Sequence, residues 1–164
     1  MSTSRAWPEP VERVAAFLRQ AAVESRVEEF PAGTLTAEDA ANAVGCELAQ
    51  IVKSLVFICD GKPVLVMVGG DRRADRTKIE AAVPCEKAKI AGPDEVRSAT
   101  GFEPGAVAPF PLPQVQTILV DNELLLHEVV WTGAGSHQHV LAIAPSDLVR
   151  LTRARSADAV AEET

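Results

Sequence analysis

Hydrophobic positions in the first half of the chain follow two different spacings. Apolar residues recur every three or four positions over residues 10–25, which is typical of a helix with one buried face. Residues 51–59 are instead an almost continuous run of β-branched and aliphatic residues, which predicts a buried strand. Asp60-Gly61 separates this run from a second one at 63–68, so the pattern predicts a β-hairpin.

The remaining pattern mixes short helices and short strands. Thr36 and Asp39 resemble a capping box for a helix that ends at Gly45. Residues 101–113 contain four prolines and two glycines beside large apolar residues, which predicts an irregular but packed segment. The other predicted elements are helices at 75–83, 93–101 and 145–152, a helical turn at 124–126, strands at 27–30, 86–91, 115–120, 128–131 and 137–143, and a tight loop at 133–136.

This arrangement predicts one α+β domain with a mixed sheet, because hairpins outnumber regular βαβ units and no internal repeat is present. A length of 164 residues fits a single domain with a sizeable core. We expect a flexible N-terminus at 1–9, the domain at 10–152, and a flexible, frayed C-terminal tail at 153–164.

Composition narrows the function classes. The net charge of −7 argues against salt-driven nucleic-acid binding over the whole surface, but it leaves room for a local basic pocket that binds one end of a nucleic acid. No run has the length of a membrane span and no signal-peptide pattern begins the chain, so we expect a cytoplasmic protein with no membrane or DNA partner. Three widely spaced cysteines predict neither a disulfide framework nor a thiol redox protein.

Lys53 is the first candidate for chemistry. Strand alternation places it on the same face as Leu55, Phe57 and Cys59, and an ammonium on an apolar face is costly unless an anion meets it. The alternative is that Lys53 lies at the wet end of the strand and reaches water along its flexible stem.

Backbone groups and acids supply the other candidates. Gly101, Gly105, Gly133 and Gly135 allow a ligand to approach the backbone closely, although glycines in loops more often only form turns. Asp121 ends a predicted strand, where it has either a functional role or a capping role.

Two histidines form an H-x-H pattern. His137 and His139 could ligate a metal, but no third ligand has a suitable spacing, and a hydrogen-bonding histidine beside a pocket is favoured. Arg72 and Arg73 are either a solvated loop or a phosphate contact. No nucleotide or redox-cofactor motif appears, so we predict no metal and no cofactor.

Taken together and in order, these stretches resemble the YbaK/ProX family of aminoacyl-tRNA deacylases, whose domain also occurs as the editing insertion of bacterial prolyl-tRNA synthetases. The resemblance covers roughly residues 10 to 152. It rests on residues 36–45, I-V-K-S-L-V-F at 51–57, G-G-D-R-R at 69–73, T-G-F-E-P-G-A-V-A-P-F at 100–110, Val120-Asp121, G-A-G at 133–135 and the downstream A-P-S-D-L. It departs from the family at F-P-L-P, 110–113, where many members have Phe-Gly.

The resemblance implies a strongly bent mixed sheet flanked by helices and hydrolysis of the ester that joins a wrong amino acid to tRNA, often tRNA for proline. Lys53 matches the family's pocket lysine, Gly101 its pocket-lining glycine and Asp121 its strand-end aspartate, which together form the implied catalytic set. The implied substrate-binding set is Phe102, Gly105, Gly133, Ala134, Gly135 and His137.

The resemblance also frames specificity and partners. His137 resembles the histidine of the branch that edits alanine, so alanine is the first expectation, with serine, cysteine and small non-protein amino acids open. The expected partner is the acceptor end of mischarged tRNA, delivered with a prolyl-tRNA synthetase or an elongation factor. The competing interpretation is a non-catalytic module that binds a tRNA end or a synthetase.

Overall fold

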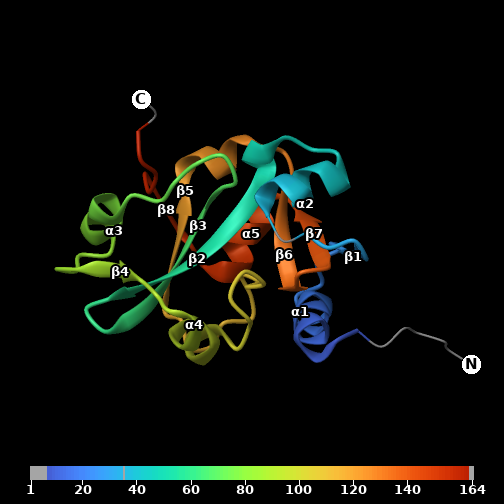
Figure 1. Cartoon of the computed structure of the whole chain (residues 1–164), viewed down its shortest axis with the longest axis horizontal. Helices are drawn as coiled ribbons and strands as arrows, with labels where there is room; N and C mark the ends of the chain where they lie inside the picture. The colour runs from blue at the N-terminus through green and yellow to red at the C-terminus, as the bar shows by residue number, and fades with distance from the viewer. Residues whose placement is uncertain (1–6, 35, 163–164) are drawn as a thin grey trace, which may run out of the picture.

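The computed structural model describes residues 7–34 and 36–162, and its centre is one eight-stranded mixed sheet (Figure 1). The strand order is β1-β7-β6-β2-β3-β5-β8, and β4 pairs with β2. The strands are β1 (Val27–Glu29), β2 (Ile51–Cys59), β3 (Lys62–Gly69), β4 (Ala88–Ile90), β5 (Thr117–Asp121), β6 (Val130–Ser136), β7 (His139–Ile143) and β8 (Arg155–Ala157).

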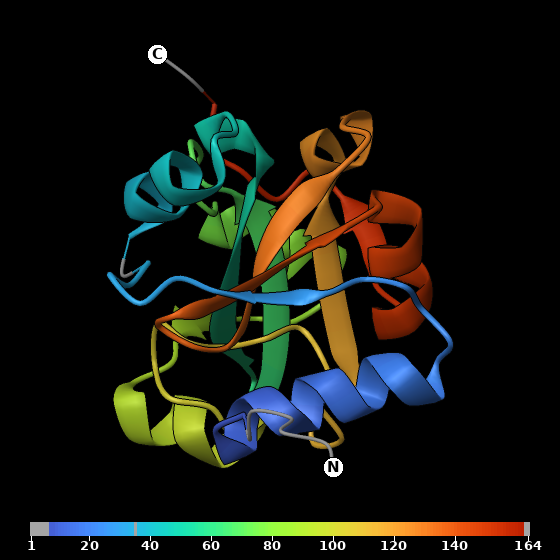
Figure 2. The same cartoon turned by 90° about the vertical axis from the view of Figure 1, so that its right-hand side faces the viewer.

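The sheet is strongly curled, and helices cover its faces and ends, which confirms the predicted α+β class (Figure 2). In Figure 2, α1 lies across one end of the sheet and α5 along one side. No helix of the described residues is long and apolar enough to cross a membrane. The helices are α1 (Glu9–Gln20), α2 (Ala37–Val44), α3 (Arg76–Ala82), α4 (Pro93–Thr100) and α5 (Pro145–Thr152), with short 3-10 helices η1 (Leu48–Gln50) and η2 (Asn122–Leu126).

The β2–β3 hairpin forms as predicted. Asp60 (φ 50°) and Gly61 (φ 85°) both have positive φ, as a two-residue turn with the twist of the flanking strands requires. The two strands pair without a break from Val52–Gly69 to Cys59–Lys62. On its other edge β2 runs parallel to β6 and antiparallel to β4, so the sheet is mixed.

The segment 101–113 is irregular and packed, as predicted. Phe102 and Phe110 are 1% and 2% exposed and belong to the main core. The guanidinium of Arg13, on α1, lies 4.6 Å from the centre of the Phe102 ring, and Phe17 stacks on Phe110. Helix α1 therefore fixes this segment against the sheet.

The predicted tight loop at 133–136 is wrong, because these residues form the second half of β6. Gly133 pairs with Val140 and Ser136 with His139, and a bulge lies between these two pairs. A Cβ atom on Gly135 (φ 103°) would lie 2.8 Å from the Pro10 carbonyl oxygen. The glycine thus permits close packing of α1 on β6 rather than a turn.

The two ends of the domain also differ from expectation. The frayed tail is wrong for residues 155–157, because β8 pairs in parallel with β5, and Ala159 and Val160 beyond it are buried. The first helix ends at Gln20, since Ala22 takes a positive φ of 57°. The expected flexible N-terminus falls mainly on residues 1–6, which lie outside the described residues.

Candidate functional site

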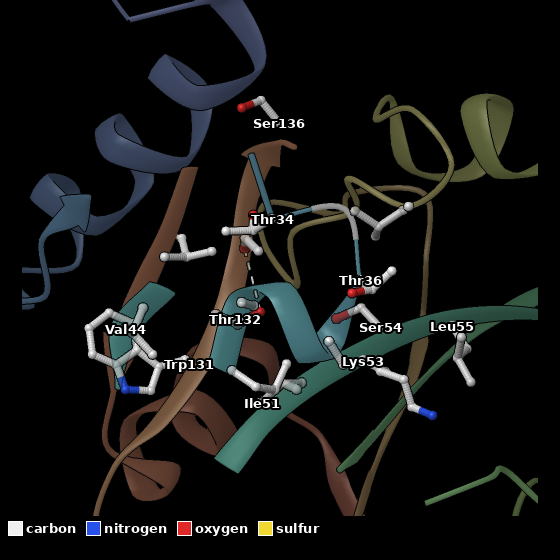
Figure 3. Close-up of a pocket in the computed structure, with 17 residues that line it drawn as sticks. Thr34, Thr36, Val44, Ile51, Lys53, Ser54, Leu55, Trp131, Thr132 and Ser136 are labelled. Carbon is white, nitrogen blue, oxygen red and sulfur yellow. Dashed lines mark hydrogen bonds between the residues drawn. The ribbon is translucent and has the colours of Figure 1, made fainter. Parts of the chain in front are cut away.

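A pocket of about 250 Å³ opens between α2 and the sheet, where β2 and β6 separate (Figure 3). Ala37, Ala40 and Val44 are spaced three and four positions apart, so they share one face of α2 and form one wall of the pocket. Val44 and Trp131 pack in the same small apolar cluster at one end. The lining consists of Thr34, Thr36, Ala37, Ala40, Val44, Ile51, Val52, Lys53, Ser54, Leu55, Gly105, Val107, Trp131, Thr132, Gly133, Ser136 and Val140.

The floor of the pocket is a break in the pairing of the sheet. Strand β2 pairs with β6 only at Ile51 and Val52. It pairs with β4 only over residues 57–59 of β2. Directly after β4, the Ala91 amide donates to the Val56 carbonyl at 2.9 Å. Within the described part of the chain, no strand pairs with residues 53–56 on this edge.

Hydroxyl groups interrupt the apolar lining. The Ser54 hydroxyl is buried and has no hydrogen-bond partner among residues 7–34 and 36–162. The Thr34 hydroxyl donates to the His137 carbonyl at 2.9 Å, and the Thr36 hydroxyl caps α2 by accepting from the Asp39 amide at 3.0 Å. Thr132 is 1% exposed. Sequence reasoning did not identify Ser54 or these threonines as site residues, and only the position of Ser54 next to Lys53 could have indicated it.

Lys53 lies at the rim of the pocket and is half-buried. Its ammonium donates to the Arg72 carbonyl at 2.5 Å, and Figure 3 shows the side chain extending away from Thr132 and Trp131. Burial lowers the pKa of Lys53, while the nearby carboxylates of Asp71 and Glu38 oppose this shift. An ammonium has three donors, so two remain for a ligand at the rim.

Gly105 and Gly133 also line the pocket, with His137 beside Gly105. Gly105 has a φ of 81°, and a Cβ atom there would lie 3.1 Å from the His137 Cε1 atom. His137 Nδ1 is buried and has no partner within the described residues. The structure therefore brings together three predicted residues, Lys53, Gly105 and Gly133, and places His137 directly behind the second.

The other predicted residues do not line the pocket. Gly101 ends α4, and its carbonyl accepts from Arg13 at 2.7 Å. Phe102 and Ala134 are core residues, and Gly135 faces α1.

Asp121 takes the capping alternative. It accepts from the Glu123 amide at 3.1 Å at the start of η2, and its second oxygen accepts from the Ala159 amide at 2.9 Å. Its carboxylate, on a residue 1% exposed, thus joins β5 to the C-terminal segment rather than facing the pocket.

The H-x-H pattern does not assemble a metal site in the described residues, where no group of three or more His, Cys, Asp or Glu could hold an ion. His139 is 2% exposed, its Nδ1 lies 2.5 Å from the Ser136 hydroxyl, and its Nε2 lies 3.8 Å from a Glu29 carboxylate oxygen. Burial lowers the pKa of His139, which favours the neutral ring. We interpret it as a buried histidine that fixes the β6–β7 turn.

The candidate site is thus a small, mostly apolar pocket with hydroxyl groups in its wall and a lysine at its rim, set in a curled α+β domain. The chain belongs to the aminoacyl-tRNA editing domain family, whose sequence model matches residues 32–151. This confirms the resemblance drawn from the motifs.

Individual relatives agree with this assignment. Uncharacterized protein YwhH of Bacillus subtilis (strain 168) is 33% identical over 126 residues, which cover 76% of this chain and 80% of that protein. Proline--tRNA ligase of Limosilactobacillus fermentum is 32% identical over 97 residues, 56% of this chain but only 17% of the ligase. A crystal structure of a protein proposed as a trans-editing enzyme for prolyl tRNA synthetase has a TM-score of 0.90 and 35% identity, and covers 96% of this chain and 100% of that one.

Proposed function

We propose that this protein is a trans-editing deacylase that hydrolyses the ester between a small, wrongly attached amino acid and its tRNA. The main support for this proposal is the pocket of about 250 Å³, with Lys53, Gly105 and Gly133 in its lining. This volume lies just below the usual range for ligand pockets, so it suits an amino acid with a small side chain better than a large one.

The reaction needs no covalent bond between the substrate and the protein. A water oxygen adds to the ester carbonyl carbon, the bond from that carbon to the ribose oxygen breaks, and the ribose oxygen takes up the water's proton. The products are a free amino acid and tRNA with a free hydroxyl. Because the ester is already labile, positioning the ester and stabilising the developing oxyanion are sufficient tasks for the pocket.

Lys53 is the residue to which we assign the main electrostatic role. Its two free donors at the rim would bind the terminal phosphate or polarise the ester region. Backbone groups of Gly105 and Gly133 would orient the ribose hydroxyl or the attacking water. A Schiff base on Lys53 does not fit, because no ketone or aldehyde substrate is implied.

Similarity and His137 support our proposal for the tRNA and the amino acid. Similarity to prolyl-tRNA ligases and to the trans-editing structure favours tRNA for proline, with a synthetase or an elongation factor delivering it. The resemblance of His137 to the histidine of the branch that edits alanine favours alanine, and this ring lies against Gly105 of the pocket lining. Proline must be rejected, since its hydrolysis would destroy correctly charged tRNA.

A deacylation time course tests this function. Purified protein is incubated with tRNA for proline charged with Ala, Ser, Cys or Pro, beside Lys53→Ala and the control Lys89→Ala, whose side chain is exposed on β4. We expect selective loss of one wrong amino acid, a decrease of about 10²-fold or more in Lys53→Ala, and no change in Lys89→Ala. Full activity in Lys53→Ala would overturn the role of Lys53. Binding of charged tRNA without turnover would favour the non-catalytic module.

A further inference from the structure

The unpaired edge of β2 exposes the backbone of Ser54 to the pocket. Alternate residues of a strand direct their amide and carbonyl groups to the same edge. Val56 directs its carbonyl to the pocket edge, where Ala91 donates to it, whereas the Ile51 carbonyl faces the β3 edge and accepts from Gly70 at 2.7 Å. Ser54 is two residues from Val56, so its amide and carbonyl also point to the pocket edge.

Neither neighbouring strand reaches these groups. The parallel β2–β6 ladder ends at the Val52–Thr132 pair, one step before a bond from the Ser54 amide to the Gly133 carbonyl would form. The β2–β4 ladder begins only at Phe57. Ser54 thus presents a backbone donor and a backbone acceptor to the pocket, in addition to its buried hydroxyl without a partner in the described chain.

An aminoacyl ester carries the complementary pair of groups. Its α-ammonium is a donor and its carbonyl oxygen an acceptor, in the N–Cα–C order of one strand residue. In an antiparallel sheet, two residues that face each other in a hydrogen-bonded pair exchange two such bonds across about 5.5 Å between Cα atoms. The gap between β6 and β4 therefore provides the place of one missing residue.

We propose that the open edge of β2 binds the amino-acid part of the ester as the missing strand residue. The Ser54 amide donates to the ester carbonyl and the Ser54 carbonyl accepts from the α-ammonium. This inference rests on the proposed deacylase function. The same amide then faces the oxyanion that forms as water adds, which is the position that favours catalysis.

This pairing also fixes where the substrate side chain lies. Residues opposite each other in an antiparallel pair place their side chains on the same face, with Cβ atoms about 4.5–5.5 Å apart. The substrate side chain consequently lies beside the Ser54 hydroxyl. A serine substrate can hydrogen-bond to that hydroxyl and an alanine substrate cannot, so Ser54 becomes a specificity-determining residue.

Amide hydrogen exchange tests the backbone contact. The probe is 3′-deoxy-3′-(L-alanylamino)adenosine, in which an amide replaces the labile ester and keeps the ammonium and the carbonyl. At saturation we expect the Ser54 amide to exchange at least about tenfold more slowly, while the Val52 amide, already paired with β6, stays unchanged. The propionyl analogue, which lacks only the ammonium, should bind about tenfold or more weakly.

The outcomes separate this inference from the proposed function. Deacylation without protection of the Ser54 amide, or deacylation by a protein that does not bind the probe, overturns the strand-edge contact alone. Protection of Ser54 without deacylation of any charged tRNA supports the contact and overturns the hydrolase.

Ser54→Ala tests the side-chain placement, with Ser98→Ala, exposed on α4, as the matched control. The ratio of hydrolysis rates for Ser-tRNA and Ala-tRNA should fall about threefold to tenfold in Ser54→Ala and stay constant in the control. An equal change for both substrates would show that the hydroxyl does not contact the substrate side chain. Folding is not at risk, because the mutation removes a buried hydroxyl that has no partner in the described structure.

Discussion

The two edges of β2 differ in how completely they are hydrogen-bonded to neighbouring strands. The edge toward β3 pairs continuously from Val52 to Cys59, and β3 beyond it is almost entirely buried. The opposite edge pairs with β6 at one end and with β4 at the other, and between them Ser54 has no strand partner in the described structure. The comparison shows how one strand can anchor the core along one edge and present unpaired polar groups along the other.

Leu65→Ala tests the paired edge and should have the largest effect on stability. Leu65 is fully buried opposite Val56, so its truncation leaves a cavity and should lower the free energy of unfolding by about 2–5 kcal/mol. Chemical denaturation measures this change, and the deacylation rate per folded molecule should stay within about twofold. Ile90→Ala, at a residue that is 60% exposed, should change stability by no more than about 0.5 kcal/mol. A large loss of rate at unchanged stability in Leu65→Ala would contradict the division between the two edges.

Gly105→Ala tests the open edge. Its φ of 81° makes any L-residue strained by about 1–2 kcal/mol, and the new Cβ atom would force the His137 ring to move. Gly61→Ala is the matched control, because Gly61 has a φ of 85° and its Cβ atom would meet nothing within 4 Å. We expect similar losses of stability in both variants, but a changed amino-acid preference only in Gly105→Ala. The same preference in both would show that the pocket tolerates the shift of His137.

The smallest effect concerns pH and the β6–β7 turn. The pKa of His139 is lowered in the folded state by burial, so the unfolded chain binds a proton more readily. Stability from this residue is therefore complete above its unfolded pKa of about 6.5 and decreases as the pH falls through the folded pKa. Thermal unfolding between pH 7 and 5 should show a smaller loss of stability in His139→Gln than in the parent protein, with His127→Gln as the control. Equal pH dependence in the parent and His139→Gln would contradict this account.

Local signals predicted much of the fold because their causes are local. The Asp60-Gly61 turn, the Thr36 cap and the left-handed Gly45 after α2 each depend on a few neighbouring residues, and all three form as expected. Strand alternation and loop glycines made Lys53, Gly105 and Gly133 candidates, and the family resemblance gave each of them a role at a pocket. What could not be predicted depends on contacts between distant segments. The sequence predicts a loop at Gly135, because the contact that requires a glycine there is with Pro10, more than a hundred residues away.

The candidate site shows the same limit. The sequence leaves the role of Asp121 open, because its partner, the Ala159 amide, lies on a distant segment that the sequence predicts to be frayed. Ser54 carried no sequence signal of its own, because its importance comes from where the β6 and β4 ladders stop. Register across a sheet is set by non-local pairing, which a single sequence does not specify.

The break in the sheet has a further consequence for the solubility of the protein. An exposed strand edge is normally a template for aggregation, because a strand of another chain can add to it. Here the stretch without a strand partner on this edge is only residues 53–56 in the described structure, and it is bounded by β6 at one end and by β4 at the other. A gap of this length has room for a single residue and none for an incoming strand. At this position the sheet can thus keep backbone hydrogen-bonding groups open to a small ligand without offering an edge long enough for a strand of another chain.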